Sequence, residues 1–351
     1  MTAPNRMAAV RGEDRAGNLT CALDVLRDEI AASIAAKRSE TLFVKVNAID
    51  SNFPLACTHP RALESVLDWL APYFKRIIVG DNSFVFSKLK DRHPYAHLAG
   101  RFAALQFSDL TEFGARPMDF CGADGVKTRA PYSCLPEQAY TVSLSLPKTH
   151  DAVTFTGCSK NMFGCTLGNR LALHAVTPLE RIRIARLVRS NAYIHRNLRT
   201  MIEKIPADLA IMDAFVGMEG QGPIFGTAVP MRLALVSRDR IAVDSVACEL
   251  AGLPLPEYLE LCGRDGLGCA RPSEVTLVGQ GFERREDLAC PFRPHYLQAY
   301  QLMREPPSGW TPRLDLRMVL AYGRRFHRLL DKMQETWSNN RGNGLGRASD
   351  S

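Results

Sequence analysis

Short apolar runs alternate along the chain with segments whose apolar residues recur at helical spacing. Runs rich in Val, Ile and Phe predict buried strands over 41–47 and 76–81. Helical spacing predicts helices over 21–37 and 61–73, and a proline suited to a first helical turn precedes the second of these. Because buried-type strands alternate with helices, this rhythm is typical of a parallel α/β sheet.

The same rhythm continues through the middle of the chain. It predicts strands over 105–109, 140–146, 208–213 and 232–237, and a helix over 244–251. The predicted fold class is therefore α/β, with a mostly parallel sheet, helices on both faces and an additional amphipathic helix near the C-terminus.

The pattern also divides the chain into segments of different character. Residues 1–20 read as a flexible leader and 21–285 as the α/β body. The body is either one unit or two lobes divided near 140–200. A proline-rich segment and the basic helix occupy 286–337, and the polar residues 338–351 are expected to be disordered.

Composition and charge narrow the function classes. The chain has 351 residues, 46% of them hydrophobic, and a net charge of +7. It is long enough to bury a core without disulfides. Basic residues concentrate in the helix predicted over 316–337, and the body shows no basic stripe with interleaved aromatics, so nucleic acid is not expected as a partner. The basic helix either packs on the body or contacts a protein partner or a membrane surface.

The N-terminus and the cysteines point to a cytoplasmic protein. The first residues lack the apolar region of an export signal, and no apolar stretch is long enough to span a membrane. The ten cysteines are therefore expected to be reduced thiols. None forms a CxxC pair, and this spacing argues against an iron–sulfur cluster.

The densest polar segment follows the strand that ends near residue 146. His150, Lys160, Asn161 and His174 come within a short stretch, and Gly157 permits close approach of the backbone to a ligand. Lys160 is placed to bind an anion or a cofactor, or to act as a nucleophile if it is desolvated. His150 and His174 are suited to proton transfer or to holding a divalent metal; each of them alone also fits a structural role.

A second candidate segment is a glycine-rich loop that follows another predicted strand. The strand ends at Asp213, and Gly220 and Gly222 lie beside Glu219. Such a loop lets the backbone approach a ligand closely, although its spacing matches neither nucleotide-binding motif. Asp213 and Glu219 are candidates for a general base or a metal ligand, and tight turn geometry is the alternative explanation.

Three further polar residues stand where ligands bind in α/β sheets. Asn47 and Asp81 follow predicted strands, and parallel sheets bind ligands at the carboxyl ends of their strands. Asp244 stands at the start of a predicted helix. We consider all three as cofactor-binding candidates; the alternatives are that Asn47 and Asp81 cap turns and that Asp244 complements the helix dipole.

At this level of detail the sequence resembles the bacterial and archaeal family called domain of unknown function 362. The resemblance extends over about 41–280 and rests on these segments: Lys45–Asn47, Thr58, Pro60, Gly80-Asp81, Leu146–His150, Thr156–Gly164, His174, Asp213, Glu219–Pro223, Gly226, Asp239, Ala242–Asp244 and Gly266–Gly268. Many relatives carry a ferredoxin-like segment with clustered cysteines, which this chain lacks.

A shorter stretch is similar to the nickel-pincer lactate racemases. His150, Phe155–Gly157, Lys160 and Gly164 match a His…Tyr-Ser-Gly…Lys…Gly pattern. In that family the lysine anchors the cofactor covalently, the histidine is an acid/base, and a later histidine coordinates nickel. By position, the resemblance implies these roles for Lys160, His150 and His174.

The leading hypothesis is an enzyme that acts on a small anionic, carboxylate-type molecule by acid/base or metal-assisted chemistry. It predicts that His150, Lys160, His174, Asp213 and Glu219 converge, whereas the reaction class stays open. The alternative is a non-catalytic cofactor-binding or redox-adaptor protein that docks through its basic C-terminal helix.

Overall fold

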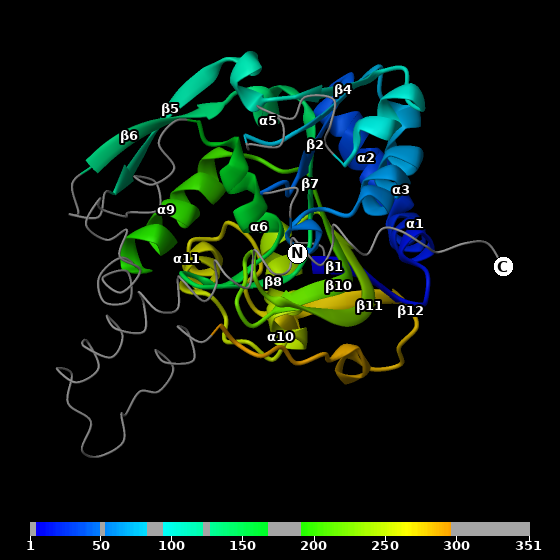
Figure 1. The fold of residues 1–351 in the computed structure, drawn as a ribbon, viewed down its shortest axis with the longest axis vertical. Coiled ribbons are helices and arrows are strands. Elements are labelled where there is room, and N and C mark those ends of the chain that lie inside the picture. Colours follow the sequence, from blue (N-terminus) through cyan, green and yellow to red (C-terminus); the bar gives the residue numbers. More distant parts are fainter. Residues whose placement is uncertain (1–4, 50–52, 83–93, 122–126, 168–190, 296–351) are drawn as a thin grey trace, which may run out of the picture.

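A mixed sheet of ten strands forms the centre of the described part of the chain, which comprises residues 5–49, 53–82, 94–121, 127–167 and 191–295 of this computed structural model (Figure 1). Its main strands are β1 (Asn5–Arg11), β2 (Thr41–Val46), β3 (Arg76–Gly80), β4 (Leu105–Ser108), β7 (Tyr140–Ser145), β10 (Leu209–Glu219), β11 (Thr227–Ser237) and β12 (Val275–Gln280).

The order of these strands is β12-β1-β11-β10-β7-β2-β3-β4. All neighbours from β10 to β4 pair in parallel, as do β12 and β1, whereas β11 is antiparallel to both of its neighbours. The predicted α/β fold with a mostly parallel sheet is thereby confirmed.

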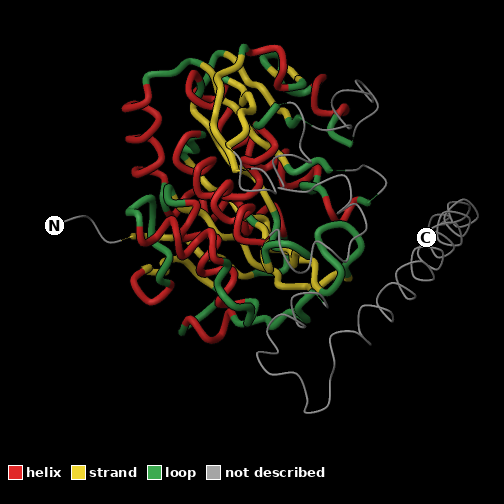
Figure 2. Tube along the Cα trace, turned by 90° about the vertical axis from the view of Figure 1, so that its left-hand side faces the viewer, coloured by secondary structure: helices red, strands yellow, loops and turns green. Residues whose placement is uncertain are grey.

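Helices cover both faces of the sheet (Figures 1 and 2). One face packs against α1 (Arg15–Val25), α2 (Arg27–Lys37) and α3 (Pro60–Leu70). The other face packs against α5 (Leu135–Gln138), α6 (Cys158–Asn161), α9 (Asn191–Lys204), α10 (Arg240–Leu250) and α11 (Glu257–Arg264). We call these the α1 face and the α6 face.

Strand β2 contributes apolar side chains to the cores on both faces of the sheet. Its side chains alternate, so that Val44 and Val46 join the core on the α1 face while Phe43 joins the core on the α6 face. A strand buried on both sides must be apolar at nearly every position. The one charged residue of this strand, Lys45, shares the α6 face with Phe43 by the same alternation.

Two short hairpins complete the described strands. β5 (Ala115–Cys121) and β6 (Lys127–Ser133) form a separate antiparallel pair at the upper left of Figure 1. β8 (Lys148–His150) pairs with β9 (Thr154–Thr156) and also contacts the far end of β10 in parallel. The β8–β9 hairpin therefore extends the sheet at the carboxyl ends of its strands.

The expectation of a flexible leader over 1–20 is wrong for residues 5–20. Residues 5–11 form β1, which pairs with β11 and β12, and α1 begins at Arg15. The apolar run from Met7 to Val10 is fully buried inside the sheet. It is only four residues long and flanked by charged side chains, so the run is too short to stand out as a strand. The helix predicted over 21–37 is likewise two helices, α1 and α2.

Several predictions lie outside the described residues. They are the basic helix over 316–337, the disordered tail over 338–351 and the position of His174. The division of the body into two lobes also stays a prediction. Within the described residues, no helix is long and apolar enough to cross a membrane.

Candidate functional site: a buried lysine cluster

The topological switch point of the sheet lies between the neighbouring strands β2 and β7, from which the chain continues in opposite directions. The chain moves from β2 to β3 by way of α3, on the α1 face, and from β7 to β10 by way of α6 and α9, on the α6 face. Open α/β sheets bind ligands outside the carboxyl ends of the strands at such a switch point. Asn47 follows β2 and Lys148 lies shortly after β7, so both stand at this switch point.

Lys45 is a buried lysine at this switch point. Its Nζ lies 2.9 Å from Oδ1 of Asp81, at the end of the neighbouring strand β3, and both side chains are almost fully buried. The same Nζ donates to the carbonyl of Val46 at 2.7 Å and to Oδ1 of Asn161 at 3.2 Å. Asp81 also accepts from the amide of Ala48 at 3.1 Å. The Lys45–Asp81 pair therefore joins two adjacent strands to α6.

Asn161 ties α6 to the sheet. Its amide nitrogen donates to the carbonyl of Lys45 at 2.8 Å and to Oγ of Ser143 at 3.0 Å. Three residues further on, Gly164 lies directly over the Lys45–Asp81 pair, because a Cβ there would come within 2.2 Å of Asp81 Oδ1. Glycine is required at 164 for this close approach.

Lys148 was not among the site residues selected from the sequence, although it is fully buried at the switch point. Its Nζ donates to the carbonyl of Ala56 at 2.8 Å. In the orientation of the Asn47 amide that satisfies both of its ends, the oxygen of that amide lies 3.1 Å from Lys148 Nζ. The charge of Lys148 thus meets two neutral acceptors rather than a carboxylate.

The surroundings of Lys148 favour its neutral form. Burial is the main cause that lowers the pKa of Lys148 to about 7. The positive charge of Lys160 acts in the same direction, while Cys57 and Asp81 act against it. The only direct signal in the sequence was the position of Lys148 just after a buried strand.

His150, two residues further along β8, is also buried and neutral. Burial, followed by the charge of Lys160, lowers the pKa of His150 to about 4 against the opposing effect of Asp151. Its Nδ1 accepts from the amide of Ala152 at 3.0 Å and lies 3.0 Å from Oδ1 of Asp151. The two contacts make opposite demands on Nδ1, because the Ala152 amide requires an acceptor there and the Asp151 carboxylate requires a donor.

Lys160 is the more exposed member of this group. It belongs to α6, and its Nζ lies 5.5 Å from the centre of the Phe163 ring. Lys160 influences the titration of both Lys148 and His150. We refer to Lys45, Lys148, Lys160, His150 and Asp81 as the lysine cluster.

Asp244 holds the start of α6, the helix that carries Lys160. Its carboxylate is fully buried and accepts from the amides of Cys158 at 2.6 Å and Ser159 at 2.8 Å, at the start of α6. Gly157 leaves room for it, since a Cβ at 157 would lie 2.3 Å from Asp244 Oδ1. Burial outweighs these hydrogen bonds and raises the pKa of Asp244 to about 7. Both carboxylate oxygens are thus engaged in holding the segment that carries Lys160.

The structure does not bring Asp213 into the lysine cluster. Asp213 lies two residues after Ile211, which belongs to the core of the α1 face, so its side chain points to that face. It pairs with Arg15 of α1, with Nε and Oδ2 3.3 Å apart, and accepts from the amide of Phe215 at 3.3 Å. Burial raises the pKa of Asp213 to about 6, despite the opposing charge of Arg15.

Glu219 contacts a different part of the chain. Its carboxylate accepts from Nε of Arg293 at 2.6 Å and from the Arg293 amide at 2.8 Å. These contacts hold the pKa of Glu219 below its usual value despite the opposing effect of burial. Glu219 thereby fastens the segment around Arg293 to the end of β10.

The glycine-rich loop packs against the β8–β9 hairpin. Thr149 Oγ1 donates to the carbonyl of Gly220 at 3.0 Å and accepts from the amide of Gly222 at 3.3 Å. A Cβ at Gly222 would lie 2.0 Å from the carbonyl oxygen of Thr149, and Gly220 has a φ of +72°. These two glycines allow the loop to cover the strand between Lys148 and His150.

A family model described as a domain of unknown function (DUF362) matches residues 42–249. The chain belongs to this family. The DUF362 region contains every member of the lysine cluster, together with Asp213, Glu219 and Asp244.

The solved structure and the curated proteins compared with this chain show no close similarity to it. A crystal structure of a protein from Thermotoga maritima aligns with 65% of this chain at 12% identity and a TM-score of 0.39. The aligned part spans 59% of the length of that protein. No curated protein matches the chain. The resemblance to the lactate racemases stays a prediction.

The described residues offer no group of three or more His, Cys, Asp or Glu side chains that could hold a metal ion. Histidines that bind metals usually donate the N–H of their second ring nitrogen to an acceptor. Nδ1 of His150 contacts both the Ala152 amide and the Asp151 carboxylate. We derive no step through a metal.

Proposed function

We propose that this DUF362 protein is an enzyme that acts on a small carboxylate-bearing anion by acid/base chemistry at the lysine cluster. The observation that carries the proposal is the setting of Lys148, which is buried at the switch point against a carbonyl and an amide oxygen. Lys45 and Lys160 place further positive charge around it. A crevice that concentrates positive charge attracts an anionic substrate.

Different members of the cluster suit different steps. Lys160, the partly exposed cation, would hold the carboxylate. Lys148 would accept a proton, because an amine whose pKa is about 7 is partly neutral at physiological pH. His150 would donate a hydrogen bond from Nε2 to an oxygen on which negative charge develops, as a neutral imidazole can.

Supporting residues complete the proposed site. Asn161 and Asp81 hold Lys45 in place, and Asn47 orients the amine of Lys148. Asp244 fixes the start of α6. In this proposal these residues position the cluster and do not react themselves.

Exchange of substrate hydrogen with solvent deuterium tests the proposal without knowledge of the product. A panel of 2-hydroxy and 2-oxo carboxylates would be incubated with the protein in D₂O and followed by proton NMR. We expect the hydrogen next to the carboxylate, or to the adjacent carbonyl, to exchange in at least one compound. Lys148→Met or His150→Gln should slow this exchange by about 100-fold, the usual contribution of a positioned acid or base.

A matched control is the exposed Lys75, which pairs with Glu40 at the surface. Lys75→Met should leave the exchange rate unchanged. The alternative outcome is that the protein binds a compound without exchanging its hydrogen. If no compound shows exchange, and binding is seen with the protein but lost in Lys160→Ala, the result favours the non-catalytic binding alternative. Binding that survives Lys160→Ala would remove Lys160 from the site.

A further inference from the structure

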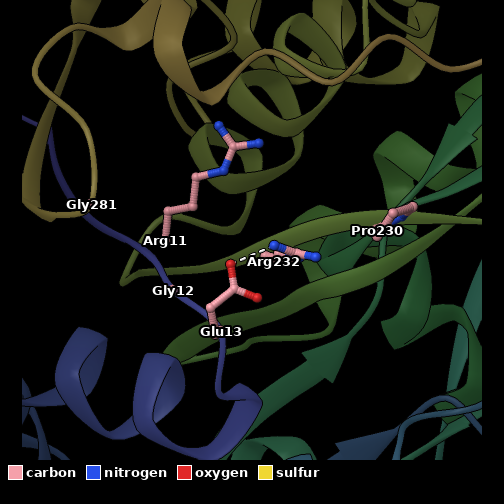
Figure 3. A pocket seen from close by; sticks show the side chains of 6 residues that line it. All are labelled: Arg11, Gly12, Glu13, Pro230, Arg232 and Gly281. Carbon is pink, nitrogen blue, oxygen red and sulfur yellow. Dashed lines mark hydrogen bonds and ion pairs between the residues drawn. The ribbon is translucent and has the colours of Figure 1, made fainter.

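A pocket of about 460 Å³ opens where β1 and β12 end, and the lysine cluster contributes no residue to it (Figure 3). Its lining consists of Arg11, Gly12, Glu13, Pro230, Arg232 and Gly281. A volume of this size is in the range of small-molecule sites. Because β1 runs parallel to β12 and antiparallel to β11, the pocket lies at the carboxyl ends of β1 and β12.

Buried contacts fix the backbone of this pocket. The side-chain amide of Asn18 donates to the carbonyls of Gly12 at 3.0 Å and Arg232 at 2.9 Å. The Gly12 amide also donates to the carbonyl of Arg232 at 3.1 Å. Gly281 has a φ of +84°, and a Cβ there would lie 2.0 Å from the carbonyl oxygen of Arg11. The wall at Gly281 therefore carries no side chain, and the space stays open.

The lining carries more positive than negative charge. Arg232 pairs with Glu13, and the side chains of this pair are 51% and 78% exposed. Arg11 extends away from that pair in Figure 3 and donates to the backbone carbonyl of Asp287. No carboxylate of the described residues forms an ion pair with Arg11. Its charge is thus uncompensated within this part of the chain.

This combination suits an oxyanion. A guanidinium is planar and presents paired N–H groups that match a carboxylate or a phosphate. An exposed ion pair contributes only about 0 to 1 kcal/mol, so Arg232 can exchange Glu13 for a bound anion at little expense.

We propose that the pocket binds a small organic oxyanion, a carboxylate or a phosphate group, through Arg11 with Arg232 as its second contact. The site is independent of the acid/base chemistry proposed above, because no residue belongs to both.

Calorimetric titration of the full chain with inorganic phosphate and with succinate tests the proposal, and sodium chloride at equal ionic strength serves as the reference. We expect saturable binding of at least one of the two anions, and Arg11→Gln should weaken it by at least 10-fold. The preferred anion distinguishes a phosphate-bearing from a carboxylate-bearing ligand.

Two control variants make the outcome specific. Arg129→Gln removes an exposed guanidinium paired with Asp119 on the β5–β6 hairpin, and it should leave binding unchanged. Lys160→Ala disables the lysine cluster and should also leave binding at this pocket unchanged. Equal weakening by Arg11→Gln and Arg129→Gln, or no saturable binding, would overturn the proposal.

Cys290 provides a second readout that does not depend on the fold of a variant. The charge of Arg11 lowers the pKa of the Cys290 thiol, against the larger opposite effect of burial. A bound anion neutralises Arg11 and should therefore reduce the thiolate fraction. Alkylation of Cys290, followed by peptide mass spectrometry at pH 8.5, should slow at least twofold with the bound anion; an unchanged rate would count against the proposal.

Discussion

Lys148 and Asp213 are two buried ionisable groups near the carboxyl edge of the sheet, and their surroundings differ. In the β8–β9 hairpin, Lys148 meets neutral acceptors and shares its surroundings with other lysines. On the α1 face, Asp213 has a cationic partner in Arg15, yet burial still raises the pKa of its carboxyl group. In both places burial favours the neutral form, but for an amine and for an acid this moves the pKa in opposite directions.

These opposite shifts require opposite responses of stability to pH. A lysine whose folded pKa is below its unfolded value contributes stability above the unfolded pKa, and this is lost as pH falls through the folded pKa. An aspartate whose folded pKa is raised contributes stability below its unfolded pKa, and this is lost as pH rises through the folded pKa. The contribution of Lys148 to stability therefore changes over the pH range from 10.5 down to about 7. That of Asp213 changes over the pH range from 3.8 up to about 6.

The largest effect is expected when the support of the α6 face is removed. Asp244→Ala leaves the buried amides of Cys158 and Ser159 without acceptors, each at about 1 to 3 kcal/mol. We expect the free energy of unfolding, from urea denaturation, to fall by about 4 kcal/mol. Asp244→Asn keeps one acceptor and should lose about half as much. A loss below about 1 kcal/mol for the alanine variant would show that Asp244 does not hold α6.

The titration of Lys148 gives the next largest effect. Between pH 6 and pH 9, the contribution of Lys148 to the free energy of unfolding should rise by about 2 to 3 kcal/mol. Urea denaturation of the protein and of Lys148→Met at both pH values isolates this contribution as a difference. Lys75→Met should show no such difference from the protein. Parallel pH profiles for the protein and Lys148→Met would remove the contrast between Lys148 and Asp213.

Asp213 should give a smaller change with the opposite sign. From pH 4 to pH 7, the contribution of Asp213 to the free energy of unfolding should fall by about 2 kcal/mol, and Asp213→Asn should abolish this fall. The measurement is the same denaturation series at lower pH. The titration of Lys148 should be unchanged in Asp213→Asn. A shift of that titration would mean that Lys148 and Asp213 are electrostatically coupled.

Glu219 is expected to have the smallest effect. Its pair with the largely exposed Arg293 is screened by solvent and contributes about 0.5 kcal/mol. The lowered pKa of Glu219 means that this contribution exists above pH 4.5 and is lost as the pH falls through the folded pKa. Glu219→Gln should change the free energy of unfolding at pH 7 by less than about 1 kcal/mol. A loss of deuterium exchange in this variant would return Glu219 to the catalytic candidates.

The sequence predicted those helices and strands whose own residues show a clear apolar period. The strands over 41–47 and 76–81 appear as β2 and β3, within one residue at each end. The short hairpins β5–β6 and β8–β9 were not predicted, because strands of three to seven residues with mixed polarity show no clear period. The strand β1 was missed for the related reason that its buried run is so short.

In the candidate site, too, the sequence predicted some residues and missed another. His150, Lys160 and Asn161 could be selected from the sequence because they follow a strand within one dense polar segment. Lys148 stands in the same segment, but its importance depends on Asn47 and Ala56, about ninety to a hundred residues earlier in the chain. No local pattern reveals such a contact.

The amino-acid sequence was enough to establish the α/β class, six of the eight main strands and the family, because these depend on local periodicity and on motifs contiguous along the chain. The partner of each charged residue was decided by the tertiary structure alone. Side-chain alternation places Lys45 on the α6 face and Asp213 on the α1 face, whereas the β8–β9 hairpin brings Lys148 against Ala56 and Asn47. Burial then shifts the pKa of Lys148 and of Asp213 toward the neutral form, because desolvation depends on everything packed around a group and not on its neighbours in sequence.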